Sequence, residues 1–426
     1  MQLFELKTYL SQNDLEVLHK IYRLRCLTIS QIYNNFYKEE YVGIEQFRDQ
    51  KLSFLIENNL VEEVLFGQNG SAIFLTTNGI RLVVEEFKIP KEIIDRETSS
   101  IKKGYHQASE LKMLPKNIPH QVHLNQFVMD FKTVFEHKKF PTTWEYFDEK
   151  YVSQYTRIRP DGLIRIMDTD LFLEMDMSTE SKTQLEDKWK RYKVFLNSVE
   201  HRNNDHKVIV LFIVDNTTQI ENRKNIIKMT AHNIVLDDID DKFEIIVGTK
   251  TELLTAIFSE IIPDIFQTNY KKGLLMQTLS KNSDFTVASA ALLASKMNNA
   301  DYGYFIRKLD ESNNVQIEDG KLQAFLIENV NRDSLSFVAK VAYLDRNLAS
   351  FHYYYKWCPP YVIVCDDLKK IYDELKFYKL ETVPNVYLTT IQRLATKPFH
   401  EAICQIGHNY SIYHFADKGL QQRVYE

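Results

Sequence analysis

Three acidic residues stand at the ends of two neighbouring segments that have the alternating character of β-strands. Asp161 opens the segment 161–166, and Glu174 and Asp176 close the segment 171–176. Carboxylates crowded together repel each other unless a positive charge lies between them. A hard divalent cation such as Mg²⁺ or Mn²⁺ takes carboxylate oxygens readily, so these residue types predict a metal site on a β-hairpin.

The spacing of the two segments predicts how the strands pair. The polar residues 167–170 have the composition of a tight turn. A four-residue turn would pair Ile166 with Leu171 and, counting back, would place Asp161 opposite Asp176. Because strand side chains alternate between faces with period two, all three acidic residues would then share one face of the sheet.

The order Pro160-Asp161, a spacer and Glu174-Met175-Asp176 resembles the motif of PD-(D/E)XK nuclease folds. The resemblance implies that Asp161 and Glu174 are catalytic metal ligands and that the carbonyl group of Met175 completes the set. Asp176 stands where the motif has a lysine that positions or activates water, which is a departure from the pattern. Some members carry this lysine on the following helix, and Lys188 is implied for that role. The alternative is that Pro-Asp-Gly is an ordinary turn and Glu-x-Asp an exposed strand.

Length and composition indicate the number of domains and the broad class to which the protein belongs. A chain of 426 residues is too long for one ordinary core, so two or three domains are expected. No apolar run of membrane-spanning length and no secretory pattern is present, so we expect a soluble, cytoplasmic protein. With a net charge of -5, nucleic-acid binding would need local patches. Four cysteines without a CxxC pair predict buried thiols rather than a zinc site or disulfides: Cys26, Cys358, Cys365 and Cys404.

Residues 13–87 follow the order helix, helix, helix, hairpin, helix, which is similar to winged helix-turn-helix DNA-binding domains. That resemblance implies that the third helix, residues 46–58, enters the major groove and that the loop 67–71 contacts the backbone or minor groove. The alternative is a protein–protein module, because this third helix is not strongly basic. The implied DNA contacts are Gln46, Arg48, Lys51 and Gln68.

Residues 91–119 show less regular patterns of apolar residues than the segments on either side. Lysines accumulate in the segment 91–119, which we expect to be a linker, and a helix should then run from His120 to about Lys138. His120 and His123 could share a helix face as metal ligands, but no HExxH pattern or cysteine accompanies them. We therefore expect packing or capping roles for both histidines.

The C-terminal part contains an echo of the central segment. Residues 172–181 are echoed by residues 325–334, and each copy is followed by a helix-like segment and an apolar strand. This order predicts a second βαβ unit. Asn329 stands in place of Asp176, so the second copy should be a degenerate, non-catalytic scaffold. Chance similarity between two βαβ units is the alternative.

The succession of winged helix, linker, Arg-Pro-Asp-Gly hairpin, Leu-Glu-Met-Asp-Met-Ser-Thr-Glu strand and Lys/Tyr-bearing helix resembles the replication-relaxation family of plasmids and mobile elements. The resemblance covers about residues 13–215. It implies origin recognition, replication initiation, or relaxation and nicking of plasmid DNA. The fold we expect is α/β. Its parts are a winged helix at 1–90, a linker at 91–119, a PD-(D/E)XK-like mixed sheet flanked by helices at 120–266, and a second, degenerate α/β domain at 267–426.

Two functions remain open from the sequence. The first is a Mg²⁺-dependent DNA nickase or endonuclease that uses a metal-activated water and is targeted by the winged helix. The second is a non-catalytic, sequence-specific DNA-binding initiator or regulator with a nuclease-like scaffold. Either function implies double-stranded DNA as partner. Replication or transfer proteins and a second copy of the chain are further candidate partners, and no membrane is implied.

Overall fold

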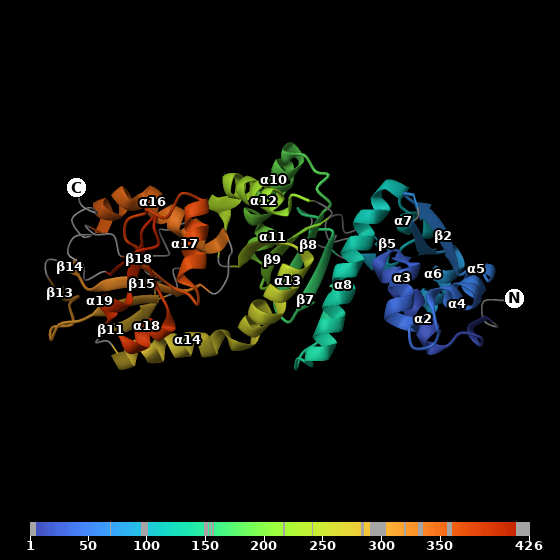
Figure 1. Ribbon diagram of the computed structural model, residues 1–426, viewed down its shortest axis with the longest axis horizontal. Helices are drawn as coiled ribbons and strands as arrows, with labels where there is room; N and C mark the ends of the chain where they lie inside the picture. The colour runs from blue at the N-terminus through green and yellow to red at the C-terminus, as the bar shows by residue number, and fades with distance from the viewer. Residues whose placement is uncertain are drawn as a thin grey trace. The chain divides into compact units, whose positions relative to one another are not determined.

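The computed structural model describes residues 6–68, 70–94, 101–148, 152, 155, 157–215, 218–240, 242–282, 285–289, 304–318, 321–330, 335–355 and 360–414. Figure 1 shows a mixed arrangement of helices and sheets, which confirms the α/β class. Contacts divide the chain into two units. The first comprises Met1–Ser181, Leu211–Lys224 and Gly248–Lys250, and the second comprises Lys182–Val210, Asn225–Val247 and Thr251–Glu426. Within the described ranges, no helix is long and apolar enough to cross a membrane.

The chain begins with helices that have well-formed N-termini. Ser11 and Thr28 each accept a hydrogen bond from the third backbone N–H of the following helix, and the reciprocal side-chain bond completes a capping box. Thr28 is thus the N-cap of the short helix that follows it. The helical elements here are α2 (Gln12–Leu24), α3 (Ile29–Ile32) continued by η1 (Tyr33–Tyr37), and α4 (Ile44–Phe47) continued by η2 (Arg48–Leu52) and α5 (Ser53–Glu57).

A three-stranded antiparallel sheet covers these helices, with strand order β1-β3-β2. It comprises β1 (Leu27–Thr28), β2 (Val61–Phe66) and β3 (Gly70–Leu75), and α6 (Thr77–Glu86) follows. Gly79 of α6 lies so close to the preceding loop that a Cβ atom would be 2.1 Å from the carbonyl oxygen of Leu60. The order of elements expected for residues 13–87 is therefore present.

Short elements occupy much of the segment expected to be a linker. They are β4 (Glu92–Ile94), β5 (Ile101–Lys103), α7 (Ala108–Leu111) and the 3₁₀ turn η3 (Pro115–Asn117). His106 in this segment is buried, and its Nε2 lies 3.0 Å from Oδ2 of Asp148. The long helix α8 (Ile118–Lys138) begins two residues before the expected start at His120.

The central sheet has five strands in the order β10-β9-β8-β7-β6. These are β6 (Trp144–Phe147), β7 (Gly162–Ile166), β8 (Thr169–Asp176), β9 (Lys207–Val214) and β10 (Phe243–Gly248). All residues of β8 are buried, as expected for the middle strand. Helices α10 (Lys182–Leu196), α11 (Val199–Arg202) and α12 (Ile220–Val235), with the turn η4 (Leu236–Asp238), connect the later strands. Helix α10 buries Leu185, Trp189, Tyr192 and Leu196 on one side.

The β7–β8 hairpin is present, but its predicted register is wrong. Ile166 pairs with Thr169 rather than with Leu171, and only Met167 and Asp168 form the turn. Met167 adopts the left-handed conformation, with φ of 54°, which allows this tight connection. Two polar residues assigned to the turn from the sequence therefore belong to the strand.

The contacts of Asp170 explain why the polar composition of residues 167–170 wrongly predicted a four-residue turn. Its carboxylate accepts hydrogen bonds from Arg165 Nε at 2.6 Å and Nη2 at 2.7 Å, and from the Tyr155 hydroxyl at 2.5 Å. A buried carboxylate satisfied in this way is tolerated in a strand interior. One step beyond the Gly162–Leu173 pair, Asp161 comes opposite Glu174 instead of Asp176. A shift of two residues leaves each side chain on the face expected for it.

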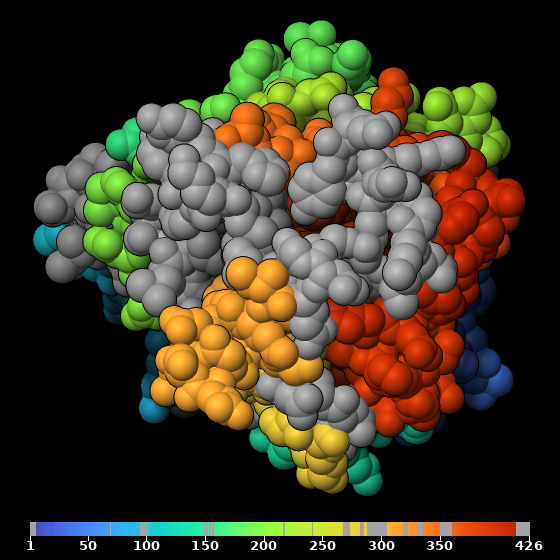
Figure 2. Space-filling view, turned by 90° about the vertical axis from the view of Figure 1, so that its left-hand side faces the viewer, coloured from blue at the N-terminus to red at the C-terminus, as the bar shows by residue number. Residues whose placement is uncertain are grey.

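A seven-stranded sheet forms the core of the C-terminal part, in the order β11-β12-β15-β16-β17-β18-β19. The strands are β11 (Phe285–Ser289), β12 (Tyr304–Lys308), β15 (Ala324–Asn329), β16 (Tyr361–Val364), β17 (Val386–Thr389), β18 (Cys404–Ile406) and β19 (Ile412–His414). A small hairpin, β13 (Ile317–Glu318) and β14 (Lys321–Leu322), lies between β12 and β15 along the chain. Figure 2 shows one face of this part, where orange segments near residues 304–318 and red segments after residue 361 reach the surface.

Strands β15, β16 and β17 run parallel, joined by α16 (Leu335–Tyr355) and α17 (Leu368–Phe377). The predicted C-terminal βαβ unit is therefore confirmed. Asn329 ends β15, whereas residues 331–334 of the echo lie outside the described residues, and a duplication stays a prediction. The remaining helices are α13 (Lys250–Ala256), η5 (Ile257–Ile261), α14 (Ile262–Asn282), α18 (Ile391–Thr396) and α19 (Phe399–Ala402).

The cysteines that can be placed are buried free thiols, as expected: Cys26, Cys365 and Cys404. Burial raises the pKa of both the Cys26 and Cys365 thiols to about 12. They are therefore uncharged and unreactive near neutral pH. Cys358 falls outside the described residues.

Candidate functional site

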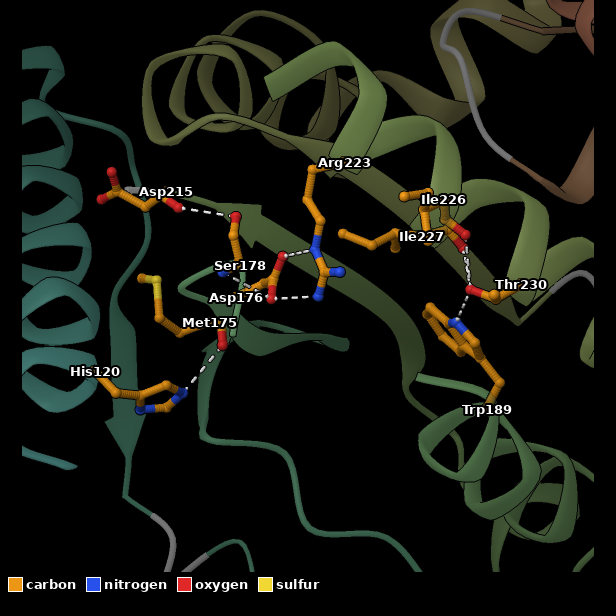
Figure 3. Close-up of polar contacts among 10 residues, drawn as sticks. All are labelled: His120, Met175, Asp176, Ser178, Trp189, Asp215, Arg223, Ile226, Ile227 and Thr230. Carbon is orange, nitrogen blue, oxygen red and sulfur yellow. Dashed lines mark hydrogen bonds and ion pairs between the residues drawn. The ribbon is translucent and has the colours of Figure 1, made fainter. Parts of the chain in front are cut away.

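Helix α8 places His120 against the start of β7 and the end of β8. Its Nε2 atom lies 3.2 Å from Oδ2 of Asp161. The same atom lies 3.0 Å from the carbonyl oxygen of Met175 (Figure 3). The Met175 N–H also donates to Oδ2 of Asp161, at 2.8 Å. A carboxylate oxygen and a main-chain carbonyl oxygen thus converge on one nitrogen atom. The side chains of His120 and Asp161 are 37% and 28% exposed, so solvent reaches this point.

A second histidine on the same helix contacts the end of β9. His123 Nδ1 lies 2.6 Å from Oδ2 of Asp215, and the two side chains are 38% and 36% exposed. The Asp215 backbone N–H donates to the Asp176 carbonyl at 3.0 Å. The Asp215 carbonyl accepts from Ser178 Oγ at 3.4 Å (Figure 3). The expectation of packing or capping roles did not anticipate these polar contacts of both histidines with aspartates.

Asp176 is bound by Arg223, an arginine without a recognisable motif in the sequence. Arg223 of α12 donates from Nε to Oδ2 at 2.6 Å and from Nη2 to Oδ1 at 2.8 Å (Figure 3). The Asp176 side chain is fully buried and that of Arg223 is 11% exposed. The hydrogen bonds to Asp176 raise the pKa of Arg223 further above its usual range. The bidentate geometry is strong and specific, so the charge of Asp176 is already compensated within the protein.

Glu174 is buried near the end of β8, at 2% exposure. Across the described parts of the chain, no three His, Cys, Asp or Glu side chains are grouped so that they could hold one metal ion. The predicted ligands Asp161, Glu174 and Asp176 thus do not form a three-carboxylate group here, and a metal site at them stays a prediction. The convergent donors, a carboxylate and a carbonyl oxygen, are nevertheless of the type that Mg²⁺ and Mn²⁺ prefer.

Lys188, implied as the displaced catalytic lysine, is half-buried in α10. The next residue, Trp189, is buried, and its indole N–H donates to Oγ1 of Thr230 at 3.2 Å (Figure 3). By its contacts α10 belongs to the second unit of the chain, and the β7–β8 hairpin to the first. A catalytic role of Lys188 therefore stays a prediction.

In the N-terminal helices, Lys51 forms an ion pair with a buried aspartate. Its Nζ lies 2.9 Å from Oδ2 of Asp14, whose side chain is fully buried, and Lys51 itself is 18% exposed. The Tyr37 hydroxyl donates to the other Asp14 oxygen at 2.5 Å. Burial raises the pKa of Asp14, but the hydrogen bonds from Tyr37, Lys51 and Ser11 outweigh that effect and the net pKa is lowered. The buried carboxylate is the natural partner of this lysine.

The other three predicted DNA contacts are exposed. Arg48 lies 3.4 Å from Glu63 with half of its side chain in solvent, Gln46 accepts from the Val42 N–H at 3.0 Å, and Gln68 lies in the turn after β2. Acidic residues outnumber basic ones among the exposed positions of this helical segment, which are Glu45, Gln46, Arg48, Asp49, Gln50, Ile56 and Glu57. The surface therefore offers few phosphate contacts.

The structure thus defines an α/β protein in which an N-terminal helical region precedes a sheet edge lined by two histidine–aspartate contacts. Residues 18–211 match the model of the replication-relaxation family. The match confirms the family resemblance drawn from the order of motifs. Comparisons with curated proteins and with solved structures gave no match.

Proposed function

We propose that this protein handles DNA during replication or relaxation of a plasmid or mobile element, and that it nicks duplex DNA at the edge of the central sheet around Asp161. The match of residues 18–211 to the replication-relaxation family supports the DNA-handling role. One observation carries the nicking role: Asp161 Oδ2 and the Met175 carbonyl oxygen both lie within 3.2 Å of His120 Nε2. Two hard oxygen donors thus converge at a partly exposed point.

Asp161 and the Met175 carbonyl would hold Mg²⁺ or Mn²⁺, with Glu174, the cross-strand neighbour of Asp161, as the further carboxylate. Mg²⁺ commonly keeps several waters and takes only one or two carboxylates together with substrate phosphates. A three-carboxylate cluster is therefore not required. The ion would supply Lewis-acid activation of the phosphate and of a water molecule. His120 orients the two oxygens by lying against both.

Asp176 has a different role in this proposal. Its carboxylate is occupied by Arg223, so it ties helix α12 to the end of β8 rather than binding the ion. Removing Arg223 from a buried carboxylate would be costly, which makes exchange for a metal unfavourable.

We further propose that residues 13–87 form a winged helix that directs the protein to duplex DNA. Capped helices followed by a two-stranded hairpin support this assignment. Arg48, Gln46 and Gln68 are the exposed residues available for contacts, whereas Lys51 is held by Asp14. Because acidic residues lie on the same surface, we expect Gln side chains in a DNA groove to contribute more to DNA binding than contacts with phosphates.

A non-catalytic initiator or regulator is the second candidate. The observation that favours it is the Asp176–Arg223 ion pair, because an acid stands in the lysine position of the nuclease motif and is already neutralised. In this case the central sheet would serve as a scaffold and partner surface.

Incubation of the purified full-length chain with supercoiled plasmid and Mg²⁺ or Mn²⁺ tests the proposal. We expect open-circular product with the wild type, none with Asp161→Ala, and wild-type levels with Asp187→Ala, a change at an exposed carboxylate. Duplex binding without nicking by the wild type would support the second candidate instead.

A further inference from the structure

The proposed nicking reaction needs a group that takes a proton from the attacking water. The nuclease motif supplies a lysine for activating water, but here Asp176 stands at that position and is bound by Arg223. We infer that His123, oriented by Asp215, is the general base of this site. The inference rests on the proposed function and names a residue that the nuclease resemblance does not.

The contact with Asp215 fixes the state of the His123 ring. At 2.6 Å, the carboxylate can only accept, so Nδ1 must carry a hydrogen atom. The neutral ring then keeps its lone pair on Nε2, the nitrogen that accepts a proton. Among the described residues, the hydrogen bond found for the His123 ring is the one at Nδ1, and the side chain is 38% exposed. A carboxylate that holds a histidine in one tautomer in this way is a recurrent arrangement in enzymes that use histidine as a base.

Asp215 is itself anchored beside the candidate ligands. Its N–H donates to the Asp176 carbonyl at 3.0 Å, one residue beyond the Met175 carbonyl that contacts His120. His120 and His123 are three residues apart on α8 and so project from the same side of the helix. The two histidines therefore lie along the same edge of the sheet, one at the oxygens of Asp161 and Met175 and the other at the end of β9.

Other groups at this edge are less suited to the role. His120 directs Nε2 towards two oxygens, and Asp176 is neutralised by Arg223. His123 combines an orienting carboxylate with a partly exposed ring.

In the proposed step, His123 activates the attacking water. A water proton passes to Nε2 of His123 as the water oxygen forms a new bond to phosphorus. The bridging P–O bond breaks, its electron pair leaves with the sugar oxygen, and that oxygen takes a proton from solvent. General-base catalysis of this kind contributes about 10²- to 10⁴-fold to a rate.

Nicking rates of the full-length protein on supercoiled plasmid test the assignment. We expect His123→Ala to lose about 10²- to 10⁴-fold in rate and to recover activity when imidazole is added, because the free base can enter the space left by the ring. Asp215→Asn should also lose activity, since an amide can hold the wrong tautomer. His137→Ala, on an exposed position of the same helix, serves as the matched control and should leave the rate unchanged.

A second readout does not depend on activity. In the NMR spectrum of the metal-free protein, the Nδ1 proton of His123 should give a downfield imidazole resonance that is lost in Asp215→Asn. A wild type that nicks while His123→Ala nicks equally fast would overturn the inference and leave the proposed function standing. A wild type that does not nick would overturn the proposed function. Absence of the Nδ1 proton signal would overturn the dyad in either case.

Discussion

Arg223 binds the buried carboxylate of Asp176 through two parallel hydrogen bonds, of 2.6 Å and 2.8 Å. The pair joins α12 to the last residue of β8. Removing one partner of a buried ion pair leaves the other charge without compensation, which costs about 3–5 kcal/mol. We predict that Arg223→Ala lowers the free energy of unfolding by this amount in urea denaturation. Lys190→Ala, which removes an exposed ion pair with Asp187, should leave the denaturation midpoint unchanged. A loss below about 1 kcal/mol for Arg223→Ala, the range of exposed pairs, would contradict this role.

Acid should weaken the N-terminal helices through Asp14. Its folded pKa is lowered because hydrogen bonds from Tyr37, Lys51 and Ser11 outweigh the effect of burial. A carboxyl with a depressed folded pKa stabilises the fold fully above its unfolded pKa of about 3.9. That contribution is lost as the pH falls through the folded value. Unfolding free energies measured from about pH 6 downward should therefore fall more steeply in the wild type than in Asp14→Asn below about pH 4. Parallel curves would argue against the assignment.

Duplex binding should depend on Arg48 without a change in fold. Arg48 is half-exposed and only loosely paired with Glu63, so its removal should cost one phosphate contact. The slope of log affinity against log salt should decrease by about 0.9. Gln50→Ala, at an exposed neighbouring position, is the control. Lys51→Ala should instead lower the melting temperature, because it removes the partner of buried Asp14. An unchanged slope for Arg48→Ala would move the DNA contact to another surface.

Gly79 should be intolerant of a side chain. An added Cβ atom would lie 2.1 Å from the Leu60 carbonyl oxygen, so the start of α6 would have to move away from the loop before β2. Overpacking of this kind costs about 1–3 kcal/mol. Gly43→Ala provides the matched comparison, because a Cβ there meets nothing within 4 Å. Equal unfolding free energies for the two variants would show that the α6 approach relaxes easily.

Local patterns in the sequence predicted the elements well but not the contacts between them. Alternation revealed the β7–β8 hairpin, yet Thr169 and Asp170 looked like turn residues because the ion pair with Arg165 that lets Asp170 lie in a strand is not visible in composition. Lys51 looked like an exposed cation because its partner, Asp14, precedes it by 37 residues.

Other contacts at the candidate site could not be predicted because the partners are far apart in the sequence. His120 and His123 were noticed for their spacing, but their aspartates lie 41 and 92 residues further on. Arg223 gave no signal, since a single arginine on an amphipathic helix is ordinary. Periodicity reports which face a residue occupies, whereas charge pairing across elements depends on how the strands and helices pack.

Binding of Mn²⁺ to the metal-free, full-length chain tests most directly whether Asp161 and the Met175 carbonyl form a cation site. An ion that binds only the folded state stabilises it by about 2.7 kcal/mol at a concentration one hundred times its Kd, and so raises the melting temperature. We predict such a rise for the wild type and for Asp187→Ala, and its loss in Asp161→Asn and Glu174→Ala. A melting temperature that millimolar Mn²⁺ leaves unchanged in the wild type, or raises equally in Asp161→Asn, would contradict the account.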